Sequence, residues 1–196
     1  MNTKLSYSMD VRGKQAADTR QRIVEATQAL FVANAGKFTL KNVASATGTS
    51  IRTVLRVFGS KETLILEAMG SFRSTVPARD ELPSTVGGAV ATLVDDYEVI
   101  GDRVIGMLNE EHRIPGLDGV ANEGRLGHRD WIEAAFAEQL ARVSSRHRVA
   151  TLTAILAATD VYVWKLLRRD FGLNRKQAQA AIERLVTGAF IESKEN

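Results

Sequence analysis

Apolar residues recur at intervals of three and four along nearly the whole chain, the spacing typical of helices that bury one face. No four-residue stretch alternates apolar and polar residues between turn signals, as a half-buried strand would. The pattern therefore predicts an all-α protein. It predicts a first helix that begins near Asp18 or Thr19 and ends at Gly36, because glycine commonly ends helices. Its buried face is expected to contain Ile23, Ala26, Thr27, Leu30 and Phe31. Residues 1–17 show no such periodicity and are expected to form a mobile basic arm.

The segment Thr39–Leu64 contains two short apolar periodicities separated by Gly48. Thr39 suits the N-cap of a short helix, and Ser50 suits the N-cap of a second one. Gly48 can take the left-handed conformation that a tight turn requires. The segment therefore predicts a helix-turn-helix. Its inward residues are expected to be Leu40, Val43, Ala44, Val54, Val57 and Phe58.

The outward positions of the second helix carry Ser50, Ile51, Arg52, Leu55 and Arg56. In a helix-turn-helix these positions face the DNA major groove. The two arginines have no acidic neighbour in sequence, and guanine edges or phosphates would suit them as partners. The alternative is a helical hairpin whose basic face is simply solvated.

Three further residues are candidate DNA contacts: Thr39, Lys41 and Lys61. Ser60 is expected to cap a helix whose free N–H groups, together with Lys61, would form an anion site for a DNA phosphate. The alternative is an ordinary helix N-terminus with a solvated lysine that binds no anion.

Beyond Lys61 the pattern predicts more helices. They are expected at about 61–76, 84–100, 104–115 and 130–143, with a flexible glycine-rich connection over 115–129. Residues 149–166 are expected to form one unbroken helix, which Gly172 stops before Asn174 caps the last one. Two such apolar helices from each of two chains would make a four-helix bundle. The expected dimer interface contains Leu152, Leu156, Val163, Ile182, Leu185 and Ala189, and the alternative is burial within one chain.

Composition adds charge asymmetry to this picture. The first 61 residues contain ten lysines and arginines against three acidic residues, a net charge of +7, and the remainder carries −4. A basic end fits a polyanionic partner, although two ordinary solvated surfaces would look similar. The chain has no cysteine, which excludes disulfides and thiolate metal sites. No run of 18 uncharged apolar residues occurs, so we expect a cytoplasmic protein with no membrane span.

Catalytic motifs do not emerge. His128-Arg129-Asp130 matches part of a kinase catalytic loop, but the other kinase motifs are absent from the sequence. Glu110, Glu111 and His112 are adjacent on a predicted helix and point in different directions. We therefore expect no enzyme activity, no metal and no cofactor.

The segment from Arg20 to Ile65, RQRIVEATQALFVANAGKFTLKNVASATGTSIRTVLRVFGSKETLI, resembles the DNA-binding domain of the tetracycline-repressor (TetR) family of bacterial transcription regulators. The resemblance implies a DNA-binding domain over 18–60 and a helical ligand-binding and dimerisation domain over 61–196. The chain departs from the family in places. Leu55 replaces a tyrosine that contacts a DNA phosphate, Val57 replaces a histidine or aromatic residue, and Arg52 replaces a small residue. The loop before Thr39 is also shorter.

The resemblance further implies a small-molecule pocket, for an apolar or aromatic effector, in the helices after Lys61. Its expected lining is Phe72, Tyr97, Met107, Trp131 and Phe136, although each of these could equally fill a core. The expected function is a homodimeric repressor that the ligand releases from a palindromic DNA operator. The alternatives are a ligand-independent regulator or activator, and an all-helical protein-interaction module.

Overall fold

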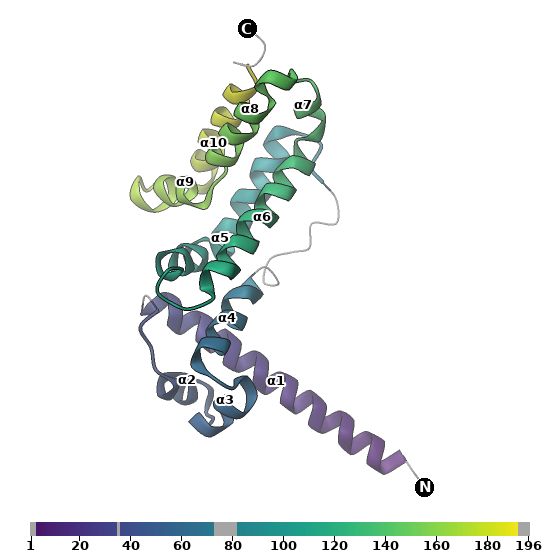
Figure 1. The fold of residues 1–196 in the computed structure, drawn as a ribbon, viewed down its shortest axis with the longest axis vertical. Helices are drawn as coiled ribbons and strands as arrows, with labels where there is room; N and C mark the ends of the chain where they lie inside the picture. The colour runs from purple at the N-terminus through teal and green to yellow at the C-terminus, as the bar shows by residue number, and fades with distance from the viewer. Residues whose placement is uncertain (1–2, 35, 73–81, 192–196) are drawn as a thin grey trace.

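The computed structural model describes residues 3–34, 36–72 and 82–191, and within these ranges it contains helices and loops but no strand (Figure 1). The expectation of an all-α fold is confirmed. The α-helices in chain order are α1 Thr3–Ala33, α2 Leu40–Thr47, α3 Ile51–Phe58, α4 Lys61–Gly70, α5 Val86–Glu110, α6 Leu117–Ala135, α7 Ala137–Ala141, α8 Ser145–Ala158, α9 Val161–Lys165 and α10 Arg175–Ile191. A π-helical turn, Leu166–Asp170, continues α9.

Helix α1 begins much earlier than expected. The prediction of a start near Asp18 was wrong, because the helix already runs from Thr3. Residues 3–17, expected as an irregular arm, therefore extend α1, and Figure 1 shows this extension projecting past α3 at the end of the molecule that is opposite the C-terminus. Apolar periodicity could not reveal this extension, because it detects only helices that bury one face.

Two apolar cores hold the fold together. One lies among α1, α2, α3 and α4 and also takes in Met107 of α5 and Leu117 and Ala121 of α6. The other lies among α5, α6, α8, α9 and α10 around the fully buried Trp164. Helices α5 and α6 thus contribute to both cores, which couples the N-terminal helices to the C-terminal ones.

The middle of the chain differs from the prediction in two places. The expected break between helices at 100 and 104 does not occur, because α5 continues through Gly101 to Glu110. Gly101 is required there by Trp164, whose ring packs directly against its Cα. The glycine-rich segment 115–129 is mostly helix α6, begun by Gly116 in the left-handed conformation (φ 83°). Its glycines 119, 124 and 127 have open space around them, and Leu117 and Ala121 anchor the helix by burial.

Two helices also end at other residues than predicted. Helix α4 ends at Gly70 rather than at Val76, which lies outside the described residues. The helix expected over 149–166 breaks after Ala158, and Asp160 caps α9 by accepting a hydrogen bond from the N–H of Tyr162 (2.8 Å). The predicted stop at Gly172 is confirmed by its positive φ of 67°. Asn174 accepts from the N–H of Gln177 (3.0 Å), as expected of an N-cap.

Ion pairs fasten α5 to the C-terminal helices. Glu98 receives both Nε (2.5 Å) and Nη2 (2.7 Å) of Arg168, and also the Nε1–H of Trp164 (3.0 Å). Arg169 pairs with Asp102 (2.9 Å) and stacks on the Trp164 ring. The hydrogen bonds from Arg168 lower the pKa of Glu98, although burial opposes this shift.

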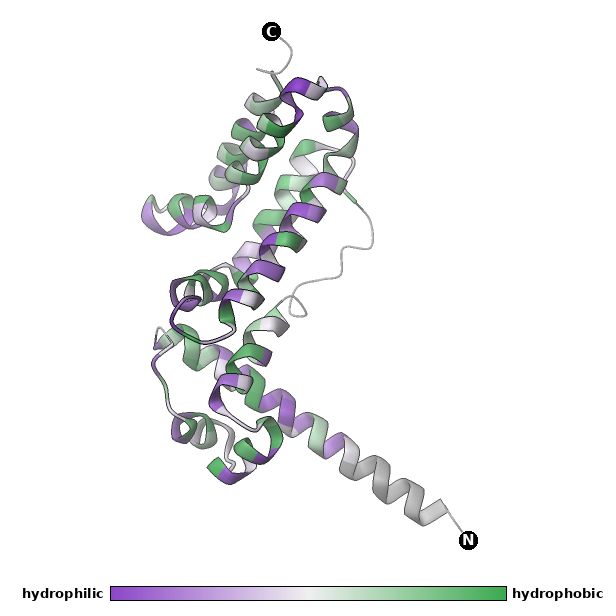
Figure 2. Cartoon of the chain, viewed as in Figure 1, coloured by the Kyte–Doolittle hydropathy of each residue, from purple (hydrophilic) through white to green (hydrophobic). Residues whose placement is uncertain are grey.

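One described segment, Ser145–Asp170, is long and apolar enough to cross a membrane by length and composition alone. The core helix of a soluble protein passes the same test. Figure 2 shows apolar and hydrophilic positions interspersed along this region, and its residues Ile155 and Trp164 are fully buried in the second core. The segment is thus divided at Thr159-Asp160 and packed against α5 and α10.

Candidate nucleic-acid interface

Helices α2 and α3 form the predicted helix-turn-helix. Thr39 and Asn42 make a reciprocal capping box at the start of α2, and Gly48 takes the left-handed conformation (φ 63°). Its N–H and that of Thr49 close the end of α2 by bonding back to its carbonyl groups. Ser50 then caps α3 by accepting from the N–H of Thr53 (3.0 Å). Each cap is worth about 1 kcal/mol, so the turn between the two helices is well determined.

Helix α3 presents a row of exposed side chains. Val54 and Phe58 are buried against α1, α2 and α4, which fixes the rotation of the helix. Ile51 (42% exposed) and Leu55 (39%) consequently face outward together with Arg52 and Arg56. Within the described residues, no hydrogen bond or ion pair engages either guanidinium group. The predicted row is therefore accessible to a partner.

Thr39 and Lys41 lie at the N-terminal end of α2, and both are exposed. The Thr39 hydroxyl is already committed to the cap, since it accepts from the N–H of Asn42 (3.2 Å) and lies 2.6 Å from Oδ1 of that residue. Lys41 remains a solvated charge at the edge of the same surface.

The anion site expected at Lys61 is partly occupied by the protein itself. The Lys61 ammonium donates to the carbonyl of Phe38 (2.5 Å) and lies 4.7 Å from the centre of that ring. Glu62 sits in the first turn of α4, where its own N–H and the Ser60 hydroxyl lower the pKa of its carboxyl group. A DNA phosphate would have to compete with this carboxylate for the helix end.

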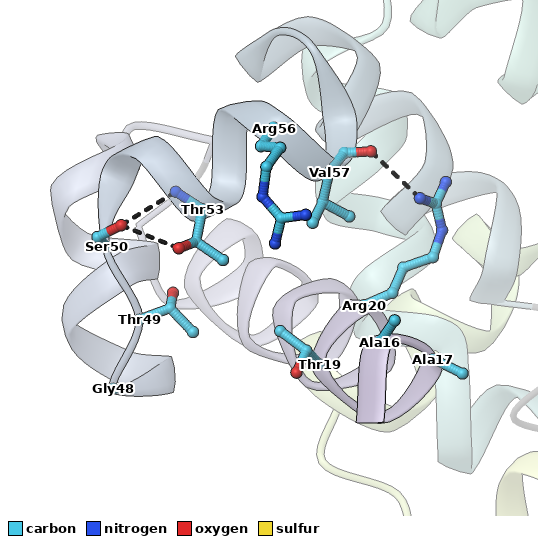
Figure 3. A pocket seen from close by; sticks show the side chains of 10 residues that line it. All are labelled: Ala16, Ala17, Thr19, Arg20, Gly48, Thr49, Ser50, Thr53, Arg56 and Val57. Atoms are coloured by element: carbon cyan, nitrogen blue, oxygen red, sulfur yellow. Dashed lines mark hydrogen bonds between the residues drawn. The ribbon is translucent and has the colours of Figure 1, made fainter. Parts of the chain in front are cut away.

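A groove of about 770 Å³ separates α1 from the turn and α3 (Figure 3). Sequence reasoning missed it, because its wall on α1 is made by part of the extension that lacked periodicity. Thr49 and Thr53 line the opposite wall with Arg56, whose side chain extends across the groove toward Thr19.

Arg20 also lines the groove but is held by the fold. It pairs through two nitrogens with Glu67 of α4, Nε lying 2.8 Å from Oε1, and it donates to the carbonyl of Val57 (3.3 Å). Its guanidinium also stacks on the Phe58 ring. Arg20 therefore joins α1, α3 and α4. The sequence could not predict this role, because it depends on how the three helices are placed relative to one another.

A second cavity, of about 740 Å³, lies among α4, α5, α6 and the break between α8 and α9. Four of the five residues expected around a ligand pocket line this cavity: Phe72, Tyr97, Met107 and Trp131. The prediction was wrong for Phe136, which is fully buried in the second core with Phe190 beside it. Phe136 lies between α6 and α7 and is not part of the lining of this cavity.

Polar groups gather at one wall of the cavity, where α8 breaks. The Tyr97 hydroxyl donates to the carbonyl of Thr159 (3.1 Å). The Thr159 hydroxyl donates to the carbonyl of Ile155 (2.8 Å) and lies 3.2 Å from Nε2 of His128. Asp96, only 5% exposed, lies on the same lining. The prediction of a loop over 115–129 did not place His128 at the cavity. Only in a helix does His128 lie on the same face as Val120 and Ala121, which line the cavity.

The residues expected at a dimer interface have different positions. Ile182 is 2% exposed and belongs to the core of its own chain, so the structure corrects that assignment. The others on the expected seam are half-buried against that core, namely Leu152, Leu156, Val163 and Ala189. Leu185 is 53% exposed. The exposed positions of α8 and α10 mix small and charged residues: they include Ala150, Ala154, Ala157 and Ala180, and also Arg146, Arg148, Lys176 and Arg184.

Comparison of the sequence with models of known protein families gives no match, and comparison with curated proteins gives none. Comparison with solved structures finds the same fold in the crystal structure of a transcriptional regulator from Rhodococcus sp. Rha1. The TM-score is 0.67, and the alignment covers 90% of this chain and 98% of that chain at 12% sequence identity. The chain therefore has the fold of a known transcriptional regulator.

Proposed function

We propose that the protein is a homodimeric DNA-binding transcriptional regulator of the TetR type, and that a small molecule controls its affinity for DNA. The observation that carries this proposal is the exposed row of Ile51, Arg52, Leu55 and Arg56 on a helix held by two caps and a buried face. A helix that enters the major groove needs this combination of a rigid placement and unoccupied donors. The shared fold with the Rhodococcus regulator supports the same function.

The proposed dimer interface is the outer surface of α8 and α10. Val149 (77% exposed) and Leu185 leave apolar area in water at this surface, and the alanines around them would let two pairs of helices approach closely. Antiparallel pairing of the two helices with a second copy would bury this area in a four-helix bundle. A dimer in turn presents two copies of α3, as a near-palindromic site requires.

The 740 Å³ cavity is the proposed effector site. Its volume falls in the range of small-molecule pockets, and its apolar lining with a few convergent polar groups is typical of them. The cavity touches Met69 and Phe72 at the end of α4, and α4 shares the first core with α3. A ligand that prefers one position of α4 would therefore shift the spacing of the two DNA-reading helices.

Two alternative functions differ from this proposal. A regulator without an effector would keep DNA binding and leave the cavity without function. An all-helical protein-interaction module would use the exposed row of α3 to bind a protein instead. The second alternative is disfavoured by the net charge of +7 over the first 61 residues, because a strongly basic end favours a polyanion as the partner.

Competition gel shifts with the DNA upstream of the gene separate these classes. The proposal predicts a specific complex that survives excess competitor DNA of unrelated sequence and that an effector dissolves. Persistence of the complex with every ligand that stabilises the protein would favour ligand-independent regulation. Failure to bind upstream DNA more tightly than unrelated DNA would contradict the proposal.

A further inference from the structure

We propose that the groove between α1 and α3 seats one strand of the DNA backbone, with Arg56 as its phosphate ligand. This inference rests on the proposed function and goes beyond it, because it divides the two exposed arginines by role. Arg56 positions the duplex through its backbone, whereas Arg52 is left to contact bases.

The groove has the chemistry that a phosphodiester needs. None of the ten residues that line it is acidic. The Arg56 guanidinium reaches into it with no ion-pair partner among the described residues, and a guanidinium suits phosphate because it donates two parallel hydrogen bonds. Glu67, which contacts Arg20 beside the groove, is already neutralised by that arginine.

Hydroxyl groups on α3 supplement the charge. The Ser50 and Thr53 hydroxyls lie 2.9 Å apart, and Ser50 already accepts the N–H of Thr53. Because one hydroxyl of this pair donates to the other, one proton of the two is left to donate outward. A phosphate oxygen beside Arg56 would lie within reach of that donor.

The α1 wall is shaped to let a backbone approach. Ala16 and Ala17 contribute only methyl groups to this wall, and the longer side chain of Arg20 is held against Glu67. Lys14 of α1 is exposed about one turn before Ala17. A duplex docked on the exposed row of α3 would therefore meet α1 along one strand.

The test places a negative charge in the groove. Ala16→Glu adds a carboxylate to the wall, and Ala29→Glu adds the same charge at an exposed position of α1 away from the groove. Both variants should keep the helix, since glutamate is a good helix former. Binding is measured by fluorescence anisotropy on a duplex of mixed sequence, about 30 base pairs long, over a range of salt concentrations.

Ala16→Glu is expected to weaken binding roughly tenfold relative to Ala29→Glu. Arg56→Gln is expected to weaken binding to all sequences alike and to reduce the slope of log K against log salt by about one. If the wild-type protein binds duplex DNA but the two glutamate variants bind equally, the groove assignment is wrong and the proposed function stands. If wild-type protein binds no duplex at low salt, both are wrong. Altered base preference with an unchanged salt slope in Arg56→Gln would also overturn the division of roles.

Discussion

Replacing Gly101 by alanine tests the packing that holds α9 against α5. A Cβ at this position would lie 2.6 Å from Cη2 and 2.8 Å from Cε3 of Trp164, well inside van der Waals contact. The ring cannot easily move away, because it is fully buried, donates to Glu98 and carries Arg169 on its face. Overpacking of this kind costs about 1–3 kcal/mol.

Helix propensity acts in the opposite direction, since alanine is better than glycine in a helix by about 0.5–1 kcal/mol. With contacts this short we take the upper end of the overpacking range, which leaves a net loss of about 2 kcal/mol. For a chain of this size that lowers Tm by about 4–8 °C. Gly119→Ala in α6 is the matched control, because nothing lies within 4 Å of the new methyl group, and it should raise Tm slightly. Thermal unfolding at one protein concentration measures both. Gly101→Ala melting at or above the temperature of Gly119→Ala would refute this account of the interface.

Three further predictions concern the DNA surface, the ion pairs and the dimer. Arg52→Ala should lose about 1–3 kcal/mol of discrimination at one base position, measured by competition between single-base variants of a selected site, and uniform weakening would contradict a base contact. Glu98→Gln should lower the free energy of unfolding by about 1 kcal/mol at neutral pH. Because the folded-state pKa of Glu98 is lowered, the stabilisation from its carboxylate is complete above the ordinary pKa of 4.5 and disappears as the pH falls through the folded-state pKa. The free energies of unfolding of Glu98→Gln and wild type, measured by urea titration, should therefore converge in acid. A difference that stays constant with pH would contradict this prediction. Leu185→Glu should give a monomer in sedimentation experiments, whereas Val99→Glu, at a similarly exposed position of α5, should stay dimeric; a dimer in both would move the interface elsewhere.

The helix-turn-helix was predictable because its signals are local. Caps at Thr39 and Ser50 and the left-handed turn at Gly48 act within a few residues, and the structure places all three as expected. The outward row of α3 followed from the same short-range pattern.

Other features depend on contacts that are distant in sequence. Gly101 looks like a helix breaker until Trp164 is seen against it. Ile182 of α10 was assigned to a partner chain, but α5 and α8 of its own chain take it into their core. Periodicity shows that a face is buried but does not show what buries it. It also misses a helix without an apolar stripe, such as the first part of α1.

Selection of duplexes from a random DNA library by the purified protein tests the central proposal most directly. The account predicts enrichment of a near-palindrome whose half-sites lie one helical turn or somewhat more apart, matching two copies of α3 in one dimer. It also predicts that Arg52→Ala weakens the base preference at one position, and at its symmetry-related position in the other half-site. Recovery of unrelated sequences after repeated rounds, with no motif enriched above the starting library, would contradict it.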